Sequence, residues 1–520
     1  MPKIKRESFI ESERADHFAA TLEEATRSTE EGVKYFIEPA KGTLSRGKTR
    51  RHHFIFGRRG SGKSSLLNKL RAELTLDRMP VAYIDLETFK GHSYPDVLIS
   101  IIIKTLDSYS EWFSTAGVYP ASKQSFWKKL FGAKPREKSI DSRKVDALLK
   151  RVTQMRAELA HLLTEPEEVA RVRKSRQTKE RSADGKGSVE LPQLHLEGGV
   201  SRSSGTEKEI SDNYSSKKIE TLHRRIIDFK QLFADLSSVS GKQSYLFLDD
   251  LYHIRSDHQA EVVDYFHRIT KGTNTWLKIG TIKHRTQWYF FGQPPIGMKL
   301  GDDADEIDLD VTLEKYDLTK EFLIKVLDQF CREHDSRVAD ILSDGARDRL
   351  VLASGGVARD FLSIVRRSID VTRQRLAGND RFRGDRISAE DVNKAAGELD
   401  GFKREDFRRD TSDDDSQSLN DLFEDVKKFC IEKVNCNCIL VNKETKTDSA
   451  GMIKELVDLK FLPHVRSRVT TRDKAGQIYD AYMLDISQYS GERKRRNLDM
   501  IEFWHKDGEN QLRRSSLVFT

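Results

Sequence analysis

The sequence predicts an α/β fold with a parallel sheet, followed by a helical segment and a smaller C-terminal module. Apolar strand-like runs alternate with helical patterns between residues 53 and 282, which is typical of a parallel sheet covered on both faces. A glycine-rich turn joins the first of these runs to a helix. After residue 312 the patterns become helical, and 520 residues are too many for a single core.

The glycine-rich turn follows the strand-like run 53–56 and precedes the helical run 66–74. Its residues 57–64 fit the P-loop pattern G-x-x-x-x-G-K-[ST] without a mismatch. Glycines let backbone N–H groups point at a phosphate chain, and the helix adds its positive end. Lys63 can reach the β- and γ-phosphates, and Ser64 can hold Mg²⁺. We therefore predict a site for ATP and Mg²⁺ made of Gly57, Arg58, Arg59, Gly60, Ser61, Gly62, Lys63, Ser64 and Ser65.

A second motif lies at Leu246–Asp250, where an apolar strand ends in paired carboxylates. We expect this strand to lie beside the P-loop strand, so that its acidic end faces the nucleotide. Asp249 would then hold the Mg²⁺ shell, and Asp250 would orient or activate the attacking water. A further strand is expected at 81–86, with a helix at 94–106 after it.

Residues 119–216 interrupt this alternation and account for the long separation between the two motifs. They contain a basic–aromatic patch at 126–131, a helical pattern at 145–163 and a stretch at 171–216 rich in Lys, Arg, Ser, Glu and Gly. We expect the last stretch to be a loop. A solvated insertion and a contact with nucleic acid or a partner both remain open as its role.

Two arginines are candidates for a contact with the terminal phosphate. Arg285 follows a strand expected at 276–282, and Arg268 ends a helix expected at 258–270. Either side chain could serve the same subunit or a neighbour. An ordinary surface salt bridge is the alternative for both residues.

The order of these motifs resembles that of AAA+ ATPases, and more narrowly of their origin-recognition (initiator-like) and STAND-type branches. The resemblance covers residues 35 to 400 and implies a helical lid after the sheet. Residues 353–362 resemble the sensor-2 motif, in which Arg359 would reach over the phosphates. Residues 386–392 resemble the capped helix that closes such lids, with Ser388 as N-cap. The Asp-Asp pair departs from the Asp-Glu of most members. The resemblance thus implies these catalytic residues: Lys63, Asp250, Arg285 and Arg359.

The C-terminal module has helical patterns followed by a predicted β-hairpin, and this order resembles a winged helix. An acidic linker at 410–416 precedes it. The hairpin carries Arg466, Arg468, Arg472 and Lys474, and basic runs follow at 493–496 and 513–514. Such charges suit the backbone of double-stranded DNA. The helix at 448–459 is less basic, and winged helices also bind proteins, so a protein partner remains the alternative.

The chain therefore divides into four predicted parts. They are an N-terminal helical extension at 1–35, an α/β ATPase core at 36–312 with its insertion at about 119–216, a helical lid at 313–405, and a winged-helix-like domain with a basic tail at 417–520.

The composition indicates a cytoplasmic protein without a membrane segment. Only four cysteines occur in the chain, which suits a reducing compartment. The N-terminus lacks the apolar core of a signal peptide, and no run is long enough to span a membrane. Cys430, Cys436 and Cys438 lie close in sequence without a paired C-x-x-C, so we expect buried thiols and no zinc site. A net charge of +7 is compatible with nucleic-acid contact without establishing it.

Together these patterns favour a slowly hydrolysing ATPase that couples its nucleotide state to DNA binding or to the loading of a partner. The resemblance also allows a homo-oligomer in which a neighbour supplies an arginine. One alternative is a STAND-type signalling or defence ATPase whose winged helix packs on the core. Another is a scaffold that binds ATP without hydrolysing it.

Overall fold

A computed structural model describes residues 8–27, 31–117, 141–183, 216–399, 401, 403–405, 413–443, 448–473, 476–490 and 498–519 of the chain. Its centre is a five-stranded parallel sheet in the order β2-β3-β4-β1-β7. The strands are β1 (His52–Phe56), β2 (Val81–Asp85), β3 (Ser244–Asp249), β4 (Thr275–Thr281) and β7 (Ala304–Asp308). The central strands are buried on both faces, as the apolar runs predict. With a P-loop after β1, this sheet confirms the predicted α/β fold of a P-loop NTPase.

The expected position of the acidic strand is wrong in one respect. Strand β3 does not pair with β1, because β4 lies between them. The carboxyl ends of all these parallel strands still meet at one edge of the sheet, so Asp249 and Asp250 remain on the side of the P-loop.

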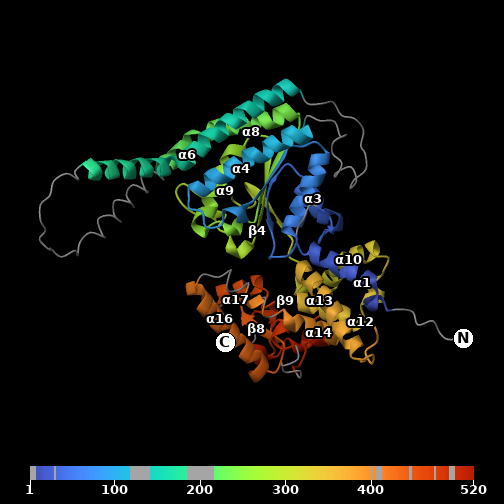
Figure 1. Cartoon of the computed structure of the whole chain (residues 1–520). Coiled ribbons are helices and arrows are strands. Elements are labelled where there is room, and N and C mark those ends of the chain that lie inside the picture. Colours follow the sequence, from blue (N-terminus) through green and yellow to red (C-terminus); the bar gives the residue numbers. More distant parts are fainter. Residues whose placement is uncertain are drawn as a thin grey trace, which may run out of the picture.

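Helices cover both faces of the sheet (Figure 1). Alternating side chains of β1 point to opposite faces: Ile55 packs with α3 (Lys63–Leu76), and Phe54 and Phe56 pack on the other side. That second face is covered by α4 (Asp96–Trp112), α8 (Ile226–Ser240) and α9 (Ser256–Thr270). A small hairpin of β5 (Tyr289–Phe290) and β6 (Ile296–Gly297), which the sequence did not predict, packs on α9.

The insertion contains one long helix, α6 (Ser142–Ala183), which lies outside α4 and α8. Its buried residues include Val145, Val152 and Leu159, so the predicted helical spacing is confirmed. The expected loop from residue 171 is wrong up to residue 183, because the helix continues there. The patch at 126–131 and the stretch from 184 to 215 lie outside the described residues.

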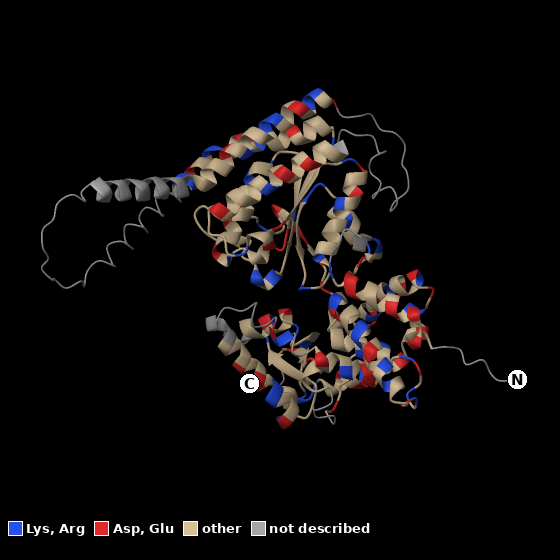
Figure 2. Ribbon diagram, viewed as in Figure 1, with Lys and Arg blue, Asp and Glu red and all other residues tan. Residues whose placement is uncertain are grey.

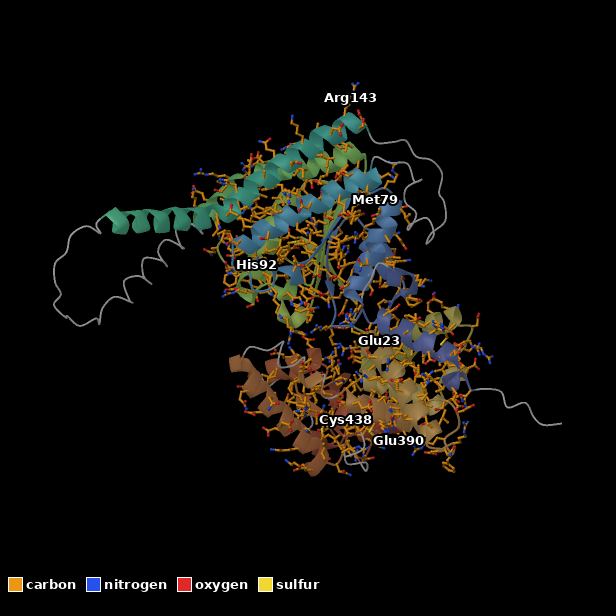
Figure 3. The ribbon with its side chains drawn as sticks, viewed as in Figure 1. Glu23, Met79, His92, Arg143, Glu390 and Cys438 are labelled. Carbon is orange, nitrogen blue, oxygen red and sulfur yellow. The ribbon has the colours of Figure 1, made fainter. Side chains whose placement is uncertain are left out.

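The helical segment after the sheet consists of α10 (Tyr316–Glu333), α11 (Val338–Ile341), α12 (Asp344–Ser354), α13 (Ala358–Ala377) and α14 (Ala389–Glu398). Ser388 caps α14 as predicted, since its hydroxyl accepts the Asp391 N–H and the Asp391 carboxylate accepts the Ser388 N–H. The N-terminal helix α1 (Glu13–Ala25) packs on α10 and α13, and Glu23 pairs with Arg366 at 3.2 Å (Figure 3).

The C-terminal module contains α16 (Asp413–Lys428), a strand β8 (Cys438–Asn442), α17 (Asp448–Asp458) and the strands β9 (His464–Val469) and β10 (Tyr479–Met483). Its antiparallel sheet has the order β8-β10-β9. The sequence did not predict β8, and part of the expected acidic linker forms the start of α16. Lys474 and the basic run 493–496 lie outside the described residues.

All four cysteines are buried free thiols. Burial raises the pKa of Cys331 to about 12 and raises the pKa of Cys430, Cys436 and Cys438 as well. Cys438 lies inside the C-terminal module (Figure 3). Within the described ranges, no His, Cys, Asp or Glu side chains gather in a group that could hold a metal ion.

Lysines and arginines alternate with acidic residues over the helices of both halves of the molecule (Figure 2).

In the part of the chain that the structure describes, no helix combines the length and the apolar character needed to cross a membrane.

Candidate functional site

The P-loop leaves β1 at Gly57 and turns into α3 through two glycines in left-handed conformations. Gly60 has φ +88°, and Gly62, the N-cap of α3, has φ +100°. A side chain at Gly60 would also place its Cβ 2.9 Å from the Cβ of Arg359. The turn therefore requires glycine at both positions, and it opens the first N–H groups of α3 toward a cavity.

Lys63 lies at the floor of this cavity with its side chain 5% exposed. Its Nζ donates to the carbonyls of Gly57 (2.9 Å) and Arg58 (3.3 Å) and lies 4.0 Å from Oδ1 of Asp250. Burial lowers the pKa of Lys63, while Asp250 and Asp249 oppose this change. The ammonium group therefore donates to two carbonyls of the P-loop and makes no close contact with a carboxylate. A phosphate oxygen could take this place as its negatively charged partner.

The hydroxyl groups of the P-loop also fit an anionic ligand. The Oγ of Ser61 is buried and has no hydrogen-bond partner among the described residues. Ser64 and Ser65 line the same cavity from the first turn of α3. Buried hydroxyl groups are normally paired, so the vacant hydrogen-bonding capacity at this helix end suits phosphate oxygens and a magnesium ion bound to them.

The carboxylate of Asp249 is buried, with each oxygen held by the chain itself. The Tyr83 hydroxyl donates to its Oδ2 at 2.7 Å, and the Asp250 N–H donates to its Oδ1 at 3.0 Å. Gly280 on β4 faces the same oxygen, and a Cβ there would lie only 2.5 Å from Oδ1. Glycine at this position lets Asp249 reach across β4, which explains how the acidic strand serves a P-loop two strands away.

Asp250 adopts a left-handed backbone conformation at φ 56° and ψ 48°. This conformation is uncommon for a residue with a side chain, although aspartate adopts it more readily than most, and it turns the chain sharply at the end of β3. Burial, and then the charge of Asp249, raise the pKa of Asp250 to about 7, while Lys63 acts in the opposite direction. A carboxylate with this pKa accepts a proton from water more readily than an exposed aspartate.

Three residues of this edge were not predicted from the sequence. Glu87 follows β2, and Tyr252 and His253 follow β3; all three line the cavity. The imidazole of His253 lies 3.9 Å from the Glu87 carboxylate. Their positions just after the tips of parallel strands were the pattern that could have identified them.

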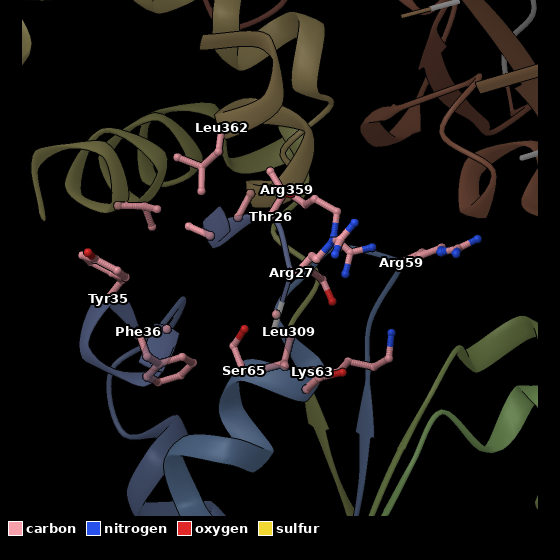
Figure 4. A pocket seen from close by; sticks show the side chains of 18 of the residues that line it. Thr26, Arg27, Tyr35, Phe36, Arg59, Lys63, Ser65, Leu309, Arg359 and Leu362 are labelled. Atoms are coloured by element: carbon pink, nitrogen blue, oxygen red, sulfur yellow. The ribbon is translucent and has the colours of Figure 1, made fainter. Parts of the chain in front are cut away.

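The other half of the cavity is apolar, and this compartment too was not predicted (Figure 4). Tyr35, Phe36 and Leu362 lie on one side of the view, and Arg59 and Lys63 lie on the other. Tyr35 stacks on Phe330 of α10 at 4.2 Å between ring centroids. Apolar walls beside a phosphate-binding loop suit a planar nucleobase. They come from the 3-10 helix Glu31–Tyr35, α10 and α13, so only the tertiary structure brings them together.

Arg359 lies at the start of α13 and in the cavity wall. Its backbone N–H donates to the Gly60 carbonyl at 3.3 Å, so the lid segment touches the P-loop directly. Arg59 also lines the cavity.

Arg58 points away from the cavity, unlike its P-loop neighbours. Its N–H and its Nε both donate to Oδ1 of Asp310, and its guanidinium donates to the carbonyls of Val311 and Gly355. The prediction that Arg58 contacts the nucleotide is therefore not supported by its orientation, because its side chain and its N–H are both engaged elsewhere.

Arg285 and Arg268, the other two candidate arginines, do not line the cavity. Arg285, in the 3-10 helix Lys283–Arg285, lies 3.7 Å from Glu455 of α17. Arg268 lies 3.7 Å from Asp264 on its own helix. The Arg268 pair matches the surface salt-bridge alternative, whereas the Arg285 side chain is only 16% exposed beside α17. Arg359 lines the cavity from the lid.

No protein-family model matches the sequence, and no curated protein matches it either. Among solved structures, a Walker-type ATPase of Pyrococcus abyssi is 12% identical, over 89% of this chain and 95% of that one, with a TM-score of 0.37. The Orc1 protein of Aeropyrum pernix, solved in complex with DNA, is 13% identical, over 90% of this chain and 89% of that one, with a TM-score of 0.33. The strand order and the P-loop geometry show that the fold is that of an α/β P-loop NTPase.

Proposed function

We propose that this protein is an ATP-binding and slowly hydrolysing switch of the AAA+ type. The observation that best supports this is the position of the Lys63 ammonium, where the P-loop, the acidic end of β3 and Arg359 of the lid meet. The triphosphate would lie along the P-loop, and the base would lie in the apolar compartment. Ser64 and Asp249 are the residues that would hold Mg²⁺, which neutralises charge on the phosphates when bound.

Each nearby side chain then has a distinct task. Lys63 stabilises the negative charge that develops on the transferred phosphoryl group. Asp250 accepts the proton of the attacking water, and Arg359 adds a positive charge from the lid. Tyr83 orients the Asp249 carboxylate through its hydrogen bond.

The test is to measure ATP binding and turnover separately. Lys63→Ala should abolish binding, whereas Asp250→Asn should keep it and lower the rate of hydrolysis by about 10²–10⁴-fold. Lys69→Ala, on the same helix but paired with Glu73, is the matched control and should change neither quantity. Failure of the wild-type protein to bind ATP would contradict the proposal. Binding without turnover would identify the non-hydrolysing scaffold instead.

For the C-terminal module we propose a regulatory protein contact, which is the role expected in the STAND-type branch. The supporting observation is that α17 contacts the ATPase core, with Glu455 beside Arg285 and Lys454 near His284. A helix that is engaged by the core is not free to enter the major groove of DNA. Arg466 of the hairpin pairs with Glu509. Arg513, near the C-terminal end, donates from its guanidinium to Thr470. Both arginines are thus engaged within the chain itself.

Duplex DNA provides the test of this second proposal. We expect no salt-dependent binding of duplex DNA in the presence of ATP. Binding that weakens steeply with salt, and that Arg472→Glu reduces, would favour the DNA-binding alternative.

A further inference from the structure

The lid and the C-terminal module form one body. A single hydrophobic cluster runs from Phe18 of α1 through Phe361 of the lid to Phe461 of the module, whereas the sheet has clusters of its own. Two ion pairs also join the lid and the residues just after it to the module. Lys403 pairs with Asp485 at 2.6 Å, and Lys460 of the module pairs with Asp360 of the lid at 3.0 Å. A continuous packed core resists bending, so a movement of the lid carries α17 with it.

This body meets the ATPase core through charged groups on α17. Glu455 lies 3.7 Å from Arg285 of the core. Asp458, one turn further, lies among the charges of Asp310, Arg58 and Arg285. Its Oδ2 is buried without a hydrogen-bond partner in the described part of the chain. We call these five residues the α17 contact. A buried carboxyl oxygen without a hydrogen-bond partner weakens the contact, which makes it able to open.

Arg58 connects the α17 contact to the nucleotide site, because it is itself a residue of the P-loop. Its guanidinium holds Asp310 after β7 and the Gly355 carbonyl at the entry to α13. On the other side of the same loop, the Gly60 carbonyl accepts the N–H of Arg359. Any rearrangement of residues 57–60 therefore acts on the lid at two points.

Cationic repulsion sets the direction of the coupling. Lys63 and Arg359 face the same cavity from the core and from the lid, and the charge of Arg359 contributes to lowering the pKa of Lys63. A polyanion between them would replace this repulsion with attraction on both sides. It would draw the lid, and with it α17, toward the core.

We propose that the α17 contact transmits the state of the P-loop to the C-terminal module, so that bound ATP tightens the docking of α17 on the core and loss of the nucleotide releases it. This inference rests on the proposed function, because it requires ATP at the P-loop. It adds the segment that responds and the residues that carry the response.

Hydrogen exchange of the full-length protein tests this inference, with the ATP dissociation constant measured on the same samples. We expect amides of α17 to exchange about tenfold more slowly with ATP and Mg²⁺. Lys63→Ala should remove this difference. Glu455→Arg places two cations opposite each other and should speed exchange of α17 without nucleotide. Adding Arg285→Glu restores an ion pair of reversed polarity and should restore slow exchange.

Amides of α14 are the internal control, because their exchange rates should stay the same in all of these variants if the fold is intact. Coupling is reciprocal, so Glu455→Arg should also weaken ATP binding by the factor by which ATP slows exchange. If ATP binds the wild-type protein and exchange of α17 is unchanged, this inference is overturned and the proposed function stands. If ATP does not bind at all, both are overturned.

Discussion

Gly280 is the residue that lets an acidic strand serve a P-loop from two strands away. Asp249 sits at the end of β3, and its Oδ1 lies where a side chain on β4 would project. The missing side chain of Gly280 leaves room for the carboxylate, and the Tyr83 hydroxyl fixes its other oxygen. Neither residue belongs to a P-loop or acidic-pair motif, so motif matching alone could not identify them.

Gly280→Ala should therefore impair catalysis through Asp249. The added Cβ would lie 2.5 Å from Asp249 Oδ1 and 3.1 Å from Leu67, so the carboxylate must move. We expect a loss of stability of about 1–3 kcal/mol. We also expect the rate of ATP hydrolysis to fall by a larger factor than the affinity for ATP. Gly345→Ala, whose Cβ would lie 3.9 Å from its nearest neighbour, is the control in denaturant titrations and steady-state assays. Equal turnover in both variants would contradict this role of Gly280.

Asp250 should give the rate of ATP hydrolysis a characteristic pH dependence. Its pKa is raised to about 7, and a general base acts only when it is deprotonated. The rate should therefore rise with pH and level off above pH 8, with a value at pH 6 about tenfold below the plateau. The measurement is single-turnover hydrolysis across this range, with ATP binding followed in parallel. A rate that is flat between pH 6 and pH 8 would exclude Asp250 as the base.

The proposed nucleotide site is assembled from segments far apart in the chain. The P-loop and the strand tips supply charged groups, and the 3-10 helix Glu31–Tyr35 with α10 and α13 supplies the apolar walls. The N-terminal extension therefore belongs to the site as well as to the lid. Its packing on α10 and α13 is what places Tyr35 and Phe36 beside the P-loop.

Leu362→Ala should separate recognition of the base from recognition of the phosphates. Leu362 is 5% exposed in the lid wall of the cavity, and its loss removes apolar contact with the base. We expect ATP affinity to fall by about tenfold or more while binding of inorganic triphosphate is unchanged. Val371→Ala, on the same helix but outside the cavity, controls for the loss of packing. If both ligands weakened equally, the compartment would not be the base site.

At the scale of the whole molecule, the lid and the C-terminal module share one hydrophobic cluster, so the predicted parts at 313–405 and 417–520 do not have separate cores. Where α17 meets the ATPase core, by contrast, the contact includes the charged groups of Arg58 and Arg285. An apolar seam holds two segments together permanently, whereas a charged contact can open and close. The division that matters for switching therefore runs between the sheet with its covering helices on one side and α1, the lid and the C-terminal module on the other.

Docking of α17 should weaken as pH rises through neutrality. Burial raises the pKa of Asp458 to about 7, with Asp310 and Glu455 adding to the rise and Arg58 and Arg285 opposing it. Undocking exposes the carboxyl group and returns its pKa toward the ordinary value, so the docked form binds more protons between the two values. Docking should thus be about tenfold weaker at pH 8 than at pH 6, as judged from hydrogen exchange of α17 corrected for intrinsic rates. Asp458→Asn should remove this dependence, and a persistent dependence in that variant would place its origin elsewhere.

Local sequence patterns were sufficient to predict the P-loop, the acidic pair, the α/β class and most helices of the lid. The turn at Gly57–Lys63 depends on the conformation of its own backbone, and the Ser388 cap depends on the first turn of the helix that follows it. Three features became visible only in the folded chain: β4 separates β3 from β1, Arg58 turns away from the P-loop cavity, and Arg285 faces α17. Strand order and side-chain direction depend on packing between segments hundreds of residues apart, which a local pattern does not encode.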